Sequence, residues 1–224
     1  MQPEASKMNT TKDNLKNTAI ATVATLATAS LAVAETQSVS ELIDKIKSKD
    51  DKVRGAAWQS AGLLGVPAVK PLVGLMTDAD METARAAKRG LWKVVRYAGR
   101  PGADDERKAV EKEILGLLDA QPTPVKREAL WMLSEIGGSD AVKAIAPLLS
   151  DRQVREDARA ALERIPVKES VAALDTALKS AAMPEEFKPA IAQSLRVRGV
   201  NVSGYPSQKL VPTRPASGAT SKTA

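Results

Sequence analysis

A pattern of 13 residues recurs along the chain, and it limits the possible folds more than any other feature of the sequence. Its clearest copies begin at Val53, Val125 and Val154, and looser copies begin at Thr83 and Phe187. In the clear copies the first position is apolar, the fifth is Ala, the ninth is Ala or Leu, and the twelfth is Leu or Ile. Helix geometry places these positions within an arc of about 80° around the helix axis. The pattern therefore predicts five helices, each of which buries one apolar stripe.

Another apolar segment with helical spacing precedes each of these five helices. The segments begin at Ser40, Pro67, Glu106, Asp140 and Lys168. Aromatic residues make up only 3% of the chain, whereas strands favour aromatic and β-branched side chains. A single helix pair cannot bury both of its apolar faces, so neighbouring pairs must stack. The sequence predicts an all-α fold, a right-handed α-solenoid of about five stacked antiparallel helix pairs.

Turn and cap signals mark the ends of the expected helices. Asp50, Asp80 and Asp151 each precede a copy of the pattern by three residues, where Asp can cap a helix N-terminus. The last position of three copies is a glycine, which favours a left-handed C-terminal cap: Gly65, Gly137 and Gly199. The copies begin 30, 42, 29 and 33 residues apart, and residues 99–106 in the long interval are rich in turn formers. We expect an enlarged loop there.

The run Asp-x-x-Val-Arg at Asp151–Arg155, followed by Ala158 and Leu162, resembles the HEAT repeat family in its short bacterial form. Residues 50–54 carry the same run, and the resemblance extends over about residues 38–199. The copies at Thr83 and Phe187 depart from it, because Val-Arg is replaced there. The resemblance implies helix pairs whose second helices line a concave surface, with Arg54 and Arg155 in structural contacts. It implies no activity.

The N-terminus has the organisation of a secretory signal peptide. Residues 17–34 are uncharged, Lys12 and Lys16 precede them, and Ala32-Val33-Ala34 fits a cleavage site. A membrane anchor and an ordinary helix are the alternatives. We predict a signal peptide over residues 1–34, a periplasmic or secreted mature protein, and no stable membrane span after cleavage.

Residues 35–199 form the predicted HEAT-like repeat domain, and residues 200–224 form an irregular tail with three prolines that is expected to be disordered from about Thr213. Val202 and Tyr205 lie in a stretch, residues 200–211, that could fold back over the last helix pair. The alternative for this stretch is a plain linker. The argument for folding back is that the terminal repeats of a solenoid need a cap with a polar outer face.

The composition argues against catalysis. The chain has no His and no Cys, so the commonest acid–base group, the thiolate nucleophile and the usual transition-metal ligands are missing. Its carboxylate clusters, such as Asp104–Glu106, fall where helix N-termini are expected and are explained by capping. We therefore predict no catalytic residue, no metal site and no cofactor, and we expect that the protein is not an enzyme.

Opposite the apolar stripe, two neighbouring helices carry arginines and tryptophans. The candidate ligand-binding residues are Arg85, Arg89, Trp92, Arg96, Arg127 and Trp131. Arg offers forked donors to anions, and Trp offers a stacking face. In the alternative interpretation, the arginines form a solvated face and both tryptophans pack between repeats. The copy at Val154 has Glu156 and Glu163 at matching positions, so any basic patch is local.

These features favour an exported, non-catalytic binding scaffold that presents a concave helical surface to a protein, an acidic peptide or an anionic polymer. The net charge of +6 supports anionic partners only weakly. One alternative is an enzyme accessory related to phycobilin lyases, against which the predicted signal peptide and the single Phe argue. A second is a nucleic-acid-binding HEAT-like solenoid, which the local extent of the basic patch disfavours.

Overall fold

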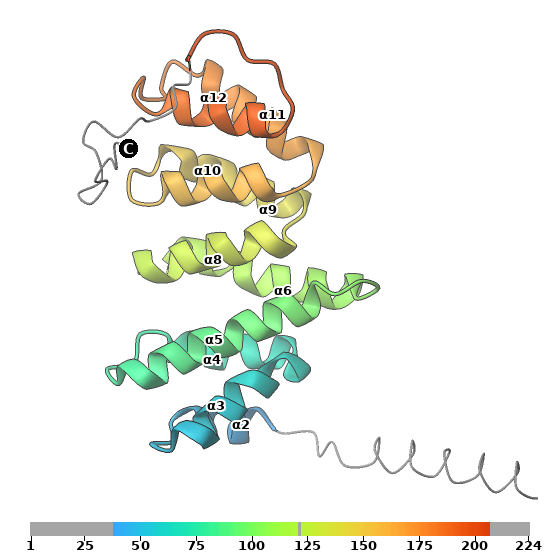
Figure 1. The fold of residues 1–224 in the computed structure, drawn as a ribbon, viewed down its shortest axis with the longest axis vertical. Coiled ribbons are helices and arrows are strands. Elements are labelled where there is room, and N and C mark those ends of the chain that lie inside the picture. The colour runs from blue at the N-terminus through green and yellow to red at the C-terminus, as the bar shows by residue number, and fades with distance from the viewer. Residues whose placement is uncertain (1–37, 121, 207–224) are drawn as a thin grey trace, which may run out of the picture.

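The computed structural model describes residues 38–120 and 122–206, and within these ranges it contains helices, turns and irregular segments but no strand (Figure 1). The predicted signal peptide, residues 1–34, lies outside the described residues, as do residues 207–224 of the predicted tail. Among the described helices, none combines the length and the apolar content needed to cross a bilayer.

The helices alternate between two layers that run the length of the stack (Figure 1). The first-helix layer consists of α2 (Val39–Ile46), α4 (Val69–Leu75), α6 (Asp104–Leu115), α9 (Ser139–Ile145) and α11 (Lys168–Lys179). The second-helix layer consists of α3 (Asp51–Ser60), α5 (Met81–Ala98), α8 (Thr123–Ile136), α10 (Arg155–Arg164) and α12 (Lys188–Val197). Short helices lie between them: η1 (Ala61–Leu64), η2 (Val66–Ala68), α7 (Leu117–Ala120) and η3 (Ala146–Ser150).

Each second helix contacts its own first helix, and consecutive second helices contact each other. The predicted all-α solenoid of stacked antiparallel helix pairs is therefore confirmed, and the five second helices coincide with the five copies of the sequence pattern. Figure 1 shows the pairs stacked from α2 and α3 at one end to α11 and α12 at the other.

The apolar stripes form one continuous core. The fifth position of the pattern is buried in all five second helices, by Ala57, Ala87, Ala129, Ala158 and Ile191. The alanines at this position in four of the helices leave room for the helix backbones to approach closely. Large side chains from the first helices fill the space between pairs, and Leu42, Leu72 and Ile114 are fully buried. Each such side chain contributes about 1.5–3 kcal/mol relative to an exposed position.

The expected N-caps are right at two positions and wrong at one. Asp50 and Asp80 cap α3 and α5 by accepting backbone N–H bonds. Asp151 does not cap α10, whose N-cap is Val154. Its carboxylate instead accepts the N–H of Gln153 at 2.9 Å. An extra turn between Asp151 and α10 moves the start of the helix beyond the reach of this side chain.

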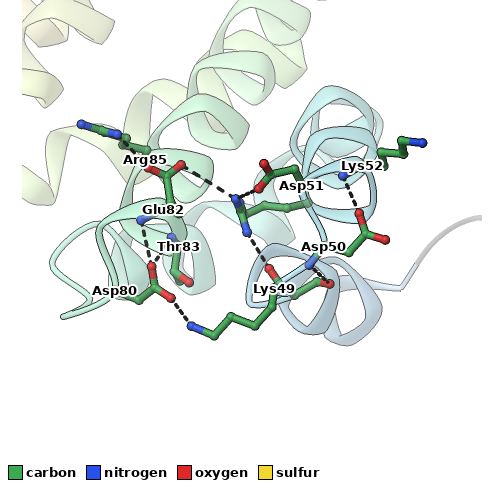
Figure 2. A network of polar contacts seen from close by, with 10 residues as sticks. Lys49, Asp50, Asp51, Lys52, Asp80, Glu82, Thr83 and Arg85 are labelled. Atoms are coloured by element: carbon green, nitrogen blue, oxygen red, sulfur yellow. Dashed lines mark hydrogen bonds and ion pairs between the residues drawn. The ribbon is translucent and has the colours of Figure 1, made fainter.

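One of the capping residues, Asp80, also takes part in a polar network that joins the first two pairs (Figure 2). Lys49 Nζ lies 2.5 Å from Asp80 Oδ2. Arg54 pairs with Asp51 in its own helix and lies 3.8 Å from Glu82 Oε2 in α5. The structural role expected for Arg54, a link to the neighbouring repeat, is therefore present in this network.

Two of the three expected left-handed glycines adopt positive φ angles. Gly199, which follows α12, has φ of 81°, whereas Gly65 combines φ of 60° with ψ of −143°, which favours glycine but is not the expected left-handed cap. The expectation was wrong for Gly137, whose φ and ψ of −68° and 145° suit any residue. Gly137 is instead required by close packing, because an added Cβ would lie 2.5 Å from the Leu133 carbonyl oxygen and 2.8 Å from the Ala141 Cβ.

The enlarged loop expected at residues 99–106 is shorter than predicted. Asp104, Asp105 and Glu106 form the first turn of α6, so the connection is limited to residues 99–103. The long interval in the repeat comes mainly from helix: α5 has 18 residues, and α7 is inserted between α6 and α8. Acidic residues in a first helical turn are stabilised by the helix dipole, which explains why this cluster starts a helix.

After α12, residues 200–206 fold back onto the last pair. Val200, Val202 and Tyr205 are partly buried and pack against the core. The guanidinium of Arg196 holds the segment, since its NH2 group donates to the carbonyl oxygens of Val202 and Tyr205 at 3.1 and 2.9 Å. Over these residues the chain covers the end of the stack, as the capping alternative expects, and the remainder of the stretch to residue 211 lies outside the described residues.

Candidate functional site on the second-helix layer

Helix α5 is the longest described helix, and it exposes a basic face. Its buried side includes Ala87, Leu91 and Val94, which repeat at helical spacing. Arg85, Arg89, Trp92 and Arg96 lie on the other side, with the arginines exposed and Trp92 half-buried. In the next second helix, α8, Arg127 and Trp131 are also exposed. The six predicted site residues thus lie on neighbouring helices of one layer.

Between α5 and α8, one carboxylate binds both an indole and an ammonium group. Glu128 accepts the N–H of Trp92 on Oε2 at 3.1 Å and the ammonium of Lys88 on Oε1 at 2.9 Å. Both donors come from α5, and the acceptor comes from α8. The indole N–H of Trp92 is therefore already used within the protein.

The same arrangement recurs one repeat further along, between α8 and α10. Trp131 donates its indole N–H to Asp157 Oδ1 at 3.0 Å, and Arg127 Nε lies 3.3 Å from Asp157 Oδ2. Arg127 also donates to the carbonyl oxygen of Gln153 at 2.8 Å. Glu128 and Asp157 occupy the same position of the sequence pattern. We call each set of a tryptophan, a cation and a carboxylate an inter-repeat joint.

The joints agree with the interpretation in which the tryptophans pack between repeats. They do not remove the residues from the surface, because the Trp131 residue remains 40% exposed. Arg85 and Arg96 also have acidic partners: Arg85 NH1 lies 2.7 Å from Glu82, and Arg96 Nε lies 3.4 Å from Glu135. Whether any of these residues binds a ligand stays a prediction.

Arg89 differs from the other predicted cations. Its guanidinium carbon lies 5.5 Å from the ring centre of Trp58 in α3, and Lys93 Nζ lies 5.8 Å from the same ring. Among the described residues, neither Arg89 nor Lys93 has a carboxylate partner. Both side chains are exposed. We call Trp58, Arg89 and Lys93 the Trp58 cluster.

The Trp58 cluster borders a shallow hollow of about 190 Å³ between α3 and α5. Trp92 and Arg96 complete the lining, and the Arg96 guanidinium lies 4.9 Å from the Trp92 ring centre. The hollow therefore combines two indole rings with three cations. Such a surface attracts carboxylate or phosphate groups and allows flat groups to stack.

Sequence reasoning missed two residues of this hollow. These are Trp58 and Lys93. The sequence does contain one signal, because Trp58 falls between the buried stripe and the exposed face of α3, where a side chain can reach the next helix. The partners of the joints, Glu128 and Asp157, were missed too, although both stand at the fourth position of the pattern.

In the described part of the chain, no group of three or more acidic residues is placed to hold a metal ion. The carboxylates of the candidate site are instead distributed along the layer, each beside a cation of the preceding repeat. The chemistry that the site offers is anion binding and aromatic stacking.

No family model matches the sequence. No curated protein matches it either. Among solved structures, the chain is similar to an engineered protein from the Northeast Structural Genomics Consortium, with 24% identity and a TM-score of 0.38 over 71% of this chain and 78% of that one. It is also similar to a designed armadillo repeat protein, with 17% identity and a TM-score of 0.31 over 71% of this chain and 99% of that one. At these TM-scores the fold assignment depends on the helix pairs themselves.

Proposed function

We propose that the protein is an exported, non-catalytic binding scaffold built from HEAT-type repeats, and that its second-helix layer binds an acidic segment of a partner protein. The observation that carries the proposal is the Trp58 cluster. Arg89 and Lys93 lie side by side on an indole ring, exposed and without a carboxylate partner among the described residues.

The neighbouring cations make this pair stand out. Lys88, Arg96 and Arg127 are each paired with a carboxylate of the next repeat. In each pair the carboxylate offsets the positive charge of the cation, so the cation attracts a negative ligand less strongly. At Arg89 and Lys93 the positive charge remains uncompensated, and a visiting carboxylate would supply the missing partner. The hollow of about 190 Å³ is sized for side-chain carboxylates rather than for a large cofactor.

Binding of defined peptides tests the proposal. A fluorescent peptide rich in glutamate should bind the protein, and the same peptide with glutamine in place of glutamate should not. Replacing Arg89→Gln and Lys93→Gln together should weaken binding about fivefold to tenfold. The affinity should also fall as salt rises, because the site is exposed.

A matched control uses the other layer. Lys108 and Lys112 are exposed on α6, and changing both to Gln removes the same charge from the first-helix layer. This control should bind the peptide as the wild type does. Equal loss in both double variants would mean that net charge, rather than the Trp58 cluster, attracts the peptide. Comparable affinity for duplex DNA would instead support the nucleic-acid alternative.

Export is a separate part of the proposal and has its own test. The uncharged run at residues 17–34 and the small residues at Ala32 and Ala34 support a cleaved signal. Mass spectrometry of the mature protein from its native host should find Glu35 as the first residue. An N-terminus at Met1 or Met8 would reject cleavage.

A further inference from the structure

A second hollow lies on the opposite side of α5, between this helix and α8. It has a volume of about 180 Å³. Its apolar lining consists of Met76, Met81, Ala84, Pro124 and Val125, and the polar residues Thr77, Arg85, Lys88 and Glu128 complete it. An engineered apolar cavity of about 150 Å³ accommodates a benzene molecule, so this hollow has room for one leucine or methionine side chain.

The apolar lining of this hollow is open to solvent. Met81 is 62% exposed, which is unusual for so large an apolar side chain. Met76, which lines the hollow, also packs against the hydrophobic core. Lys88 and Glu128, whose Nζ and Oε1 atoms lie 2.9 Å apart, line the hollow from α5 and α8 respectively. Methionine side chains adapt their shape to an inserted group, which suits such a wall to binding.

The two hollows flank the same helix. Ala84 and Lys88 line the apolar hollow, and Arg89 and Lys93 line the basic one. The midpoints of these residue pairs are about 8 Å apart along the helix axis, and the helix with its side chains is about 10 Å wide. The centres of the hollows are thus about 13 Å apart, which corresponds to about four residues of extended chain.

We infer that the acidic segment bound at the Trp58 cluster crosses α5 in an extended conformation and inserts an apolar side chain, about four residues from its carboxylates, between α5 and α8. This inference depends on the proposed function and specifies its partner. The uncompensated charge of Arg89 and Lys93 favours a negative occupant, and the apolar hollow beside it offers that occupant an anchor. An extended segment spans this distance in about four residues, whereas a helical segment would need about nine.

Three fluorescent peptides test the inference against the wild-type protein. Each carries two adjacent glutamates, and the first has a leucine four residues away on both sides, so that the direction of binding does not matter. The second has serine at those positions, and the third has its leucines directly beside the glutamates. The first peptide should bind about tenfold more tightly than the other two.

Variants of the apolar hollow between α5 and α8 test whether the preference for leucine arises there. Ala84→Trp fills the hollow and should remove the preference for leucine while leaving the serine peptide unaffected. Ala172→Trp, at an exposed position of α11 in the first-helix layer, is the matched control and should retain the preference. Met81→Ser changes an exposed side chain and should reduce the preference if Ala84→Trp fails to fold.

The outcomes separate the two proposals. Equal binding of the leucine and serine peptides, with both dependent on Arg89 and Lys93, would overturn the anchor and leave the acidic site standing. A leucine preference that survives both Ala84→Trp and Met81→Ser would also overturn it. Failure of all three peptides to bind would overturn the proposed function and the anchor together.

Discussion

The indole Nε1 of Trp131 lies 3.0 Å from Oδ1 of Asp157, which belongs to the following repeat. One repeat earlier, Trp92 makes the equivalent bond to Glu128 at 3.1 Å. In each case a basic side chain from the tryptophan's own helix binds the second oxygen of the carboxylate. The joint therefore couples consecutive helix pairs at the surface, where the apolar core no longer holds them together.

The first prediction concerns this joint. Trp131→Phe keeps an aromatic ring and removes the indole donor. It should destabilise the protein by about 0.5–1.5 kcal/mol, which is less than for a buried hydrogen bond to a charged group because this bond is partly exposed. Asp157→Asn should also destabilise it. Urea unfolding of both single variants and the double variant should give a coupling free energy of about 0.5 kcal/mol or more. Strictly additive effects would contradict the joint.

The second prediction concerns Gly137, at the tight junction between α8 and α9. Gly137→Ala should destabilise the protein by about 1–3 kcal/mol, because the new methyl group meets the Leu133 carbonyl oxygen and the Ala141 side chain. Gly55 in α3 is the control, since an added Cβ there has nothing within 4 Å. Gly55→Ala should stabilise the helix by about 0.5–1 kcal/mol. Thermal unfolding of the two variants should show opposite shifts.

The third prediction concerns Glu111, a carboxylate that is only 6% exposed. It accepts the backbone N–H of Gly138 at 2.7 Å and lies 3.5 Å from Arg107, so it connects α6 to the start of α9. Glu111→Ala leaves the N–H and the guanidinium without this acceptor and should destabilise the protein by about 1–3 kcal/mol. Glu111→Gln retains an acceptor and should lose less. Lys112→Ala, at the next and exposed position, should have little effect on the urea midpoint.

The helix pairs could be predicted because burial imposes a short local period. Positions such as Ala129, Leu133 and Ile136 must face the core in every copy, so the pattern is visible without knowledge of the neighbouring helices. The same logic correctly placed Arg85 and Trp131 away from the core. Features that depend on one helix alone could therefore be predicted from the sequence.

The contacts between helices could not be predicted from this local pattern. Trp92 and Glu128 are 36 residues apart, and their bond depends on how α5 and α8 are aligned along their axes. The stacking of Arg89 on Trp58 depends in the same way on the alignment of α3 and α5. A helical wheel gives the direction of a side chain around its axis, but it does not give the offset between neighbouring helices.

The last prediction concerns pH. The pKa of Asp80 is lowered, first by the hydrogen bond from Lys49 and then by the backbone N–H groups of Glu82 and Thr83. A carboxyl group with a depressed folded-state pKa stabilises the fold above its ordinary value of 3.8 and loses this contribution as pH falls through the folded value. Asp80→Asn keeps a capping side chain but removes the charge. The variant should thus unfold at a lower temperature than the wild type at neutral pH, and the difference should shrink as the pH falls below 3.8. Asp119→Asn, at an exposed position of α7, controls for the general loss of one negative charge. A difference in melting temperature that stays constant down to low pH would show that the Asp80 charge does not contribute through these bonds.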